Sequence, residues 1–206
     1  MIGLKIVLGK LKEGLLMIRR KSGRDRIIVD IDNTLWYLAP ELWEQLKKVN
    51  PQMPPPDQWG TRASLEKYMP LEEFFQVLKT IHMRQETFPP FPESQYFLGA
   101  LKEKGFYIVI ASHRSQETYG PTVNWLNENQ LLFDEVHLSY DKSVLFAESL
   151  ALVDDSPINL EKAVQAGLLG TGLIYSWNEK SGHPLFRNLI EVLGYLDSRL
   201  YRSKSI

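Results

Sequence analysis

Short apolar runs alternate along most of the chain with segments whose apolar residues recur every three or four positions. The runs predict buried β-strands and the periodic segments predict amphipathic helices. We expect strands at residues 27–31, 107–111, 135–139, 150–153 and 172–175. We expect helices at residues 94–104, 119–130, 143–148, 158–166 and 184–200. Because nearly continuous apolar strands that alternate with helices are typical of a parallel sheet covered on both faces, the sequence predicts a doubly wound α/β fold.

One long stretch, residues 36–91, breaks this alternation. It is rich in proline and aromatic residues and contains no good strand. Apolar spacing predicts short helices at residues 41–49 and 71–83. A connection of that length without secondary structure is uncommon inside a compact domain. We therefore interpret residues 36–91 as a small helical insert in a core made of residues 26–35 and 92–206.

The N-terminal arm, residues 1–25, is strongly basic, although the whole chain has a formal net charge of −1. Such an arm could contact nucleic acid, but a solvated basic tail is the simpler interpretation. Its apolar residues have helical spacing that two glycines interrupt, so one helix and two short strands both stay open. Met17 could be the natural start of the protein.

Composition narrows the class of protein. The chain has 206 residues and no cysteine, which excludes disulfides and thiolate metal sites. No apolar run approaches the roughly 20 residues that a membrane-spanning helix needs, and no clear signal sequence is present. We therefore expect a cytoplasmic protein without a membrane span.

Acidic and polar side chains follow four of the predicted strands. In chain order they are Asp30 and Asp32, then Ser112 and His113, then Lys142, then Asp154 and Asp155. The carboxyl ends of parallel strands meet at one edge of the sheet, and active sites of such folds lie there. We therefore expect these side chains to gather at that edge.

A cluster of carboxylates at one sheet edge needs a cation, because the carboxylates would otherwise repel one another and some would be protonated. Ligands that are all oxygen favour a hard ion, first of all Mg²⁺. Mg²⁺ also binds phosphate oxygens, and Lys142 and the amides after Ser112 would neutralise others. The sequence therefore predicts phosphoryl transfer. One carboxylate would attack phosphorus, and a second carboxylate, two residues later in the chain, would move protons.

The same residues, in the same order, resemble the four motifs of the haloacid dehalogenase (HAD) superfamily over residues 26–175. The motif D-x-D-x-[TV] matches "DIDNT", which contains Asp30 and Asp32. A strand that ends in Ser or Thr matches "YIVIAS", a lysine matches Lys142, and an acidic pair matches "LVDDSPINLEKA". The four motifs together are far more specific than the first alone.

The resemblance implies that Asp30 is the nucleophile and a Mg²⁺ ligand. It implies that Asp32 is the general acid and base, and that the Asp32 backbone carbonyl also binds the metal. Because the dehalogenases of the superfamily lack this second acid, its presence indicates a phosphatase. The remaining implied roles are phosphate binding by Ser112, the N–H of His113 and Lys142, and metal binding by Asp154 directly and by Asp155 through water or as a second ligand.

The insert resembles a C1 cap of this superfamily, and its helices and aromatic residues are similar to those of the 5′(3′)-deoxyribonucleotidases. The segment "PPFPESQYFLGALKEKGFYIVIAS" also has a lead-in common in such phosphatases. The resemblance implies a nucleoside monophosphate as the small-molecule substrate and a cap that closes over it. Trp59 and Tyr68 are our candidates for stacking on the base, whereas most aromatic residues of the insert should form its own core.

Other interpretations stay open. Asp32 could only cap a helix, the substrate could be a sugar phosphate, a phosphoprotein or a nucleic-acid 3′-phosphate, and the chain could be a non-catalytic binding module. Near the site, Arg114 could grip a second phosphate or a carboxylate, or it could point outwards. His82 and Arg84 should lie on the surface.

Overall fold

The computed structural model describes residues 25–59 and 65–200. The predictions for the basic arm and for a start at Met17 therefore lie outside the described residues, apart from Asp25 at the end of the arm.

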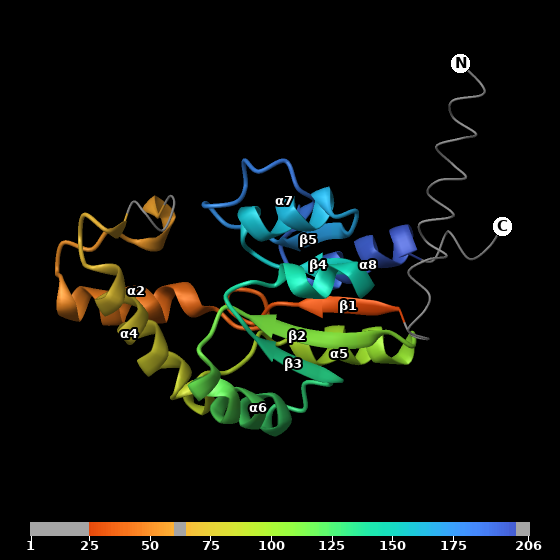
Figure 1. Ribbon diagram of the computed structural model, residues 1–206, viewed down its shortest axis with the longest axis horizontal. Coiled ribbons are helices and arrows are strands. Elements are labelled where there is room, and N and C mark those ends of the chain that lie inside the picture. Colours follow the sequence, from red (N-terminus) through yellow and green to blue (C-terminus); the bar gives the residue numbers. More distant parts are fainter. Residues whose placement is uncertain (1–24, 60–64, 201–206) are drawn as a thin grey trace, which may run out of the picture.

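A six-stranded sheet forms the centre of the molecule (Figure 1). Its strands lie in the order β3-β2-β1-β4-β5-β6, and every neighbouring pair is parallel. This arrangement confirms the predicted doubly wound α/β fold. The strands are β1 (Arg26–Val29), β2 (Tyr107–Ser112), β3 (Glu135–Leu138), β4 (Ser149–Val153), β5 (Leu169–Leu173) and β6 (Leu185–Phe186).

Helices cover both faces of the sheet, as the side chains of β1 show. Ile27 and Val29 belong to the larger hydrophobic cluster, which contains the buried residues of α5 (Ser94–Glu103) and α8 (Leu189–Leu200). Ile28 belongs to a second cluster, with residues of the 3₁₀-helix η5 (Ser143–Glu148) and of α7 (Pro157–Gln165). Because successive residues of a strand point to opposite faces, apolar residues at all three positions bury the strand on both sides.

The connection between β1 and α5 is helical, and Figure 1 shows α2 and α4 beyond the edge at which the strand arrows end. It contains α2 (Leu38–Val49), η2 (Pro56–Gln58), α4 (Leu71–His82) and η3 (Gln85–Thr87). In α2, Leu38, Leu42 and Leu46 recur every four residues and are buried, which fits the predicted amphipathic pattern. Both helices expected in this stretch are present.

The predicted helix at residues 184–200 was wrong over its first turn. Leu185 and Phe186 form β6, and α8 begins only at Leu189. The Asn188 side chain accepts a hydrogen bond from the Glu191 N–H at 2.9 Å, and Glu191 accepts one from the Arg187 N–H at 3.1 Å. The Asn188 side chain thus caps the helix and marks its start.

The last predicted strand, at residues 172–175, was also displaced, since β5 spans Leu169–Leu173. The Asn178 side chain accepts a hydrogen bond from the Tyr175 N–H and donates one to the Leu173 carbonyl, which turns the chain there.

No helix in the described part of the chain is long and apolar enough to cross a membrane.

Candidate functional site

The register of the sheet brings the ends of β1 and β4 level with each other, while β2 continues beyond them to Ser112. Val29, the last residue of β1, lies beside Ile110 of β2 and Val153 of β4. The Asp30 N–H then donates to the Val153 carbonyl at 2.9 Å. The polar residues that follow these strands therefore emerge at the same edge, as the sequence predicts.

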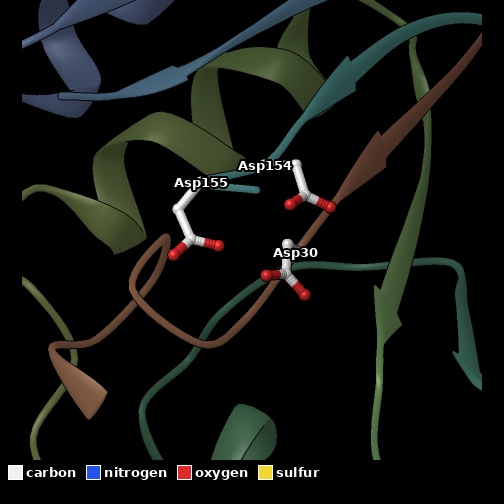
Figure 2. Close-up of side chains that lie close together, drawn as sticks. All are labelled: Asp30, Asp154 and Asp155. Atoms are coloured by element: carbon white, nitrogen blue, oxygen red, sulfur yellow. The ribbon is translucent and has the colours of Figure 1, made fainter. Parts of the chain in front are cut away.

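Three carboxylates converge at this edge, from the ends of β1 and β4 (Figure 2). Asp30, Asp154 and Asp155 each offer one oxygen, and these three oxygens lie within 4.8 Å of one another. Asp30 and Asp154 are buried and Asp155 is partly buried. The buried Lys142 places its Nζ 2.7 Å from Asp30 Oδ1 and 2.7 Å from Asp154 Oδ2, so one positive charge lies against two of the three acids.

One lysine does not neutralise the cluster, and the pKa values of its acids reflect this. Burial, followed by the neighbouring carboxylates, raises the pKa of Asp30 well above its usual value, although Lys142 opposes the rise. Burial and the Asp154 carboxylate raise the pKa of Asp155 to about 7. A bound cation would relieve this repulsion. Asp30, Asp154 and Asp155 thus fit a hard divalent ion, such as Mg²⁺, in donor type and charge.

Asp155 makes the stability of the metal-free protein depend on pH. Because its pKa is about 7 in the folded state and near 3.8 otherwise, the folded state binds more protons between these values, and the free energy of unfolding falls as pH rises through this range. Above pH 6.5 the lowered pKa of His82 keeps its imidazole neutral in the folded state. With chelator present, we expect the thermal midpoint to fall by about 2–4 °C between pH 6.5 and pH ~8.

Calorimetry at several pH values measures this loss, and Mg²⁺ should raise the midpoint more at the higher pH. Asp155→Asn is the control: an amide does not titrate, so the part of the loss that comes from Asp155 should disappear, while any part from Asp30, whose pKa is also raised, should remain. A midpoint that falls equally in wild type and Asp155→Asn would contradict the assignment to Asp155.

The fourth predicted acid, Asp32, is held away from this cluster by a different set of groups. Arg114 binds it through two nitrogens, with Nε 3.0 Å from Oδ2 and Nη2 2.6 Å from Oδ1. Ser112 Oγ donates to Oδ2 at 2.9 Å, and Trp36 Nε1 donates to Oδ1 at 2.9 Å. Burial alone would raise the pKa of Asp32, but Arg114 and then His82 outweigh it and lower the pKa well below its usual value.

Arg114 and His82 are both buried beside Asp32, so Arg114 does not point outwards and His82 does not lie on the surface. The Arg114 side chain is fully buried, and its Nη1 donates to Thr122 Oγ1 of α6 (Tyr119–Glu128) at 3.0 Å. The expectation that His82 lies on the surface was wrong, because this last residue of α4 is buried with Nε2 3.4 Å from Asp32 Oδ2. Burial and then Arg114 lower the His82 pKa, so the contact joins a neutral imidazole to a carboxylate rather than two charges.

The groups predicted to hold phosphate lie close to the acids but are already engaged. Ser112 is buried and bound to Asp32, and Lys142 is bound to Asp30 and Asp154. His113 follows Ser112 and is partly buried. A phosphate would therefore have to share Ser112 and Lys142 with the carboxylates that now bind them.

The aromatic residues singled out as base-stacking candidates pack elsewhere. Trp59 is partly buried against the core, and its indole N–H donates to the Pro54 carbonyl at 2.8 Å. Tyr68 also packs on the core.

A cleft of about 610 Å³ lies between α4 and the loops after β2 and β3. Its lining consists of Glu72, Phe75, Gln76, Lys79, Ser115 and Tyr140, and the Phe75 and Tyr140 rings meet edge to face at 6.1 Å.

Several residues around the acids were missed by sequence reasoning, among them Trp36, Asn33 and Trp177. Asn33 Nδ2 and Trp177 Nε1 both donate to Asp155 Oδ2. For Asn33 a signal exists, because it follows Asp32 within the first motif. For Trp177 there is none, since the contact depends on how the loop after β5 folds back over the end of β4.

Comparison with known proteins supports the fold. No family model matches the sequence, and no curated protein matches it. Among solved structures, a haloacid dehalogenase-like hydrolase from Streptococcus pneumoniae is similar with a TM-score of 0.64 and 15% identity, over 85% of this chain and 99% of its own. A predicted phosphoglycolate phosphatase from Haemophilus somnus has a TM-score of 0.59 and 19% identity, over 84% and 97%. CbbY from Rhodobacter sphaeroides, in complex with phosphate, has a TM-score of 0.58 and 12% identity, over 82% of this chain and 96% of its own.

Dehalogenases also occur among the similar structures. At these identities the likeness shows the fold alone, which is that of HAD-type hydrolases. The chemistry of the chain has to be inferred from its own site.

Proposed function

We propose that the protein is a Mg²⁺-dependent phosphomonoester hydrolase that forms an aspartyl-phosphate on Asp30. The observation that carries this proposal is the position of Asp30, which lies at the end of β1 beside Asp154, Asp155 and Lys142. Burial and then the neighbouring carboxylates raise the pKa of Asp30, and a bound cation would favour its ionised form. With a cation bound, Asp30 would be an ionised carboxylate at a site built for charge, as a nucleophile requires.

In the first step an Asp30 oxygen attacks phosphorus, an oxygen–phosphorus bond forms, and the bond from phosphorus to the leaving oxygen breaks. When bound, Mg²⁺ would neutralise phosphate charge and hold it against the nucleophile. Asp30, Asp154 and Asp155 would hold the ion, and Lys142 would supply positive charge to the phosphate oxygens. In the second step water attacks phosphorus and releases phosphate and the free Asp30 carboxylate.

Asp32 would move the protons of both steps, but it is better suited to accept a proton than to donate one. Arg114 favours the carboxylate form of Asp32, which suits the base that accepts a proton from attacking water. Donation of a proton to the leaving oxygen is opposed by the same ion pair. We therefore expect leaving groups of low pKa, such as phenols, to depend less on Asp32 than alcohols do.

A nucleoside monophosphate is the substrate that we propose. The cleft between α4 and the core presents Phe75 and Tyr140 beside polar Gln76 and Ser115, a combination that can stack on a base and hydrogen-bond its edge. We also propose that the helical segment at residues 36–91 acts as a cap, since α4 lines this cleft and carries His82 to Asp32.

Phosphate release over a panel of nucleoside monophosphates, sugar phosphates and an aryl phosphate, with and without Mg²⁺, tests this proposal. We expect Mg²⁺-dependent release with the lowest KM among the nucleotides. Release that is confined to sugar phosphates would exclude the nucleotide substrate but keep the reaction. Release that persists unchanged in chelator would contradict the metal-dependent mechanism.

A further inference from the structure

The loop after β5 is tied to Asp155 at two points. Trp177 Nε1 donates to Asp155 Oδ2 at 3.2 Å, and Asn178 Nδ2 donates to the Asp155 carbonyl at 2.8 Å. Asn178 Nδ2 also donates to the Leu173 carbonyl at 2.9 Å, at the end of β5. The side chain and the backbone of Asp155 are thus bound to the same short segment.

Asn33, on the loop after β1, reaches the same carboxylate oxygen. Its Nδ2 lies 3.1 Å from Asp155 Oδ2. Its backbone is left-handed, with φ 58°, a conformation that asparagine tolerates better than most residues. Its carbonyl accepts a hydrogen bond from Tyr175 Oη at 2.8 Å, so Asn33 is itself held in place by the loop after β5.

Stacked rings connect the two donors. The Tyr175 and Trp177 rings are 4.4 Å apart and nearly parallel, at 8°. Tyr175 therefore fixes Asn33 through its hydroxyl and Trp177 through its ring. Both donors bind Oδ2, which leaves Oδ1 as the Asp155 oxygen available to a cation.

From this geometry we propose that Asn33 and Trp177, here called the Asp155 brace, are positioning residues for the metal ion. The inference rests on the metal site of the proposed function. Hydrogen bonds to a ligating carboxylate fix its rotation, and loss of such partners typically weakens metal binding by about 10–100-fold. The brace would turn Oδ1 towards Asp30 and Asp154 before the ion arrives, so that less ordering is needed on binding.

Trp177→Phe tests the brace, because phenylalanine keeps a ring to stack on Tyr175 but has no N–H. The probe is Mn²⁺, a hard ion that accepts the same oxygen ligands and whose free form is measured by electron paramagnetic resonance. Without substrate, we expect Trp177→Phe to raise the Mn²⁺ dissociation constant about tenfold. The thermal midpoint of the metal-free protein should change little, which separates positioning from a general structural role.

Trp43→Phe is the matched control. Trp43 is also partly buried and donates its indole N–H, but to the Met53 carbonyl at 3.2 Å. This variant should bind Mn²⁺ as wild type does. Asn33→Gly is the second variant: it keeps the left-handed backbone, removes the other donor to Oδ2 and should also weaken Mn²⁺ binding.

Asp155→Asn shows whether a negative result concerns the Asp155 brace or the metal site itself. If Asp155→Asn loses Mn²⁺ binding while Trp177→Phe and Asn33→Gly bind like wild type, the brace is wrong and the metal site stands. If Trp43→Phe weakens binding as much as Trp177→Phe does, the brace is also wrong. Absence of Mn²⁺ binding by the wild-type protein would overturn the metal site itself and the brace with it.

Discussion

Replacing Asp30 with Asn should lower Mg²⁺-dependent phosphate release by about four orders of magnitude or more. An amide fills nearly the same space as a carboxylate but does not attack phosphorus, so the covalent step is lost while the shape of the site remains. Steady-state phosphate release, with the most active substrate of the panel, measures the effect.

Asp141→Asn is the matched control for this result. Asp141 lies at the same edge of the sheet but is exposed, where it accepts a hydrogen bond from the Ser143 N–H. Its replacement should leave the turnover number almost unchanged. Asp30→Asn should not lower the thermal midpoint of the metal-free protein, because burial and the neighbouring acids already disfavour the Asp30 carboxylate. An Asp30→Asn variant that keeps a tenth of wild-type activity would contradict the assignment of the nucleophile.

The second large effect is expected at Arg114. Arg114→Met should lower the free energy of unfolding by about 3–5 kcal/mol, because it leaves the Asp32 carboxylate without its charged partner in a largely buried position. Ser112 and Trp36 still donate to Asp32, but neutral donors do not replace a bidentate guanidinium. Denaturant unfolding at neutral pH measures the loss.

Two further variants show whether the unpaired charge is the cause. The double variant Arg114→Met with Asp32→Asn removes the charge and should recover most of the lost stability. Lys104→Met breaks an ion pair with Asp197, at 3.1 Å and partly exposed, and should cost at most about 1 kcal/mol. A double variant as unstable as Arg114→Met alone would show that packing, rather than charge pairing, explains the loss.

The sheet edge and its acids were predictable because both depend on short-range patterns. Apolar runs identify the strands, and parallel strands must present their carboxyl ends together, so Asp30, Lys142 and Asp154 could be placed at one site from their positions after strands. The start of α8 was predicted too early, because the helical spacing of apolar residues continues back through Leu185 and Phe186. The helix begins later, after the Asn188 side chain caps it, and the apolar pattern does not show this cap.

The surroundings of Asp32 could not be predicted, because they depend on contacts between distant segments. Arg114 is 82 residues from Asp32 along the chain, and His82 reaches it only because α4 ends against the core. The sequence left open whether Arg114 binds a carboxylate or points outwards, and it placed His82 on the surface, because the sequence pattern does not identify the buried partner of a polar residue. For Trp59 the structure adds what the sequence did not indicate: its indole N–H donates to a carbonyl of its own segment, and its ring packs on the core.

Trapping of the covalent intermediate tests the central claim most directly. Wild-type protein is mixed with Mg²⁺ and substrate, quenched in acid during turnover and treated with borohydride, which reduces an aspartyl-phosphate to homoserine. Peptide mass spectrometry then locates the change. We predict homoserine at position 30, and none in a sample quenched before substrate is added. Turnover that leaves Asp30 unmodified, or that modifies another carboxylate, would contradict the account.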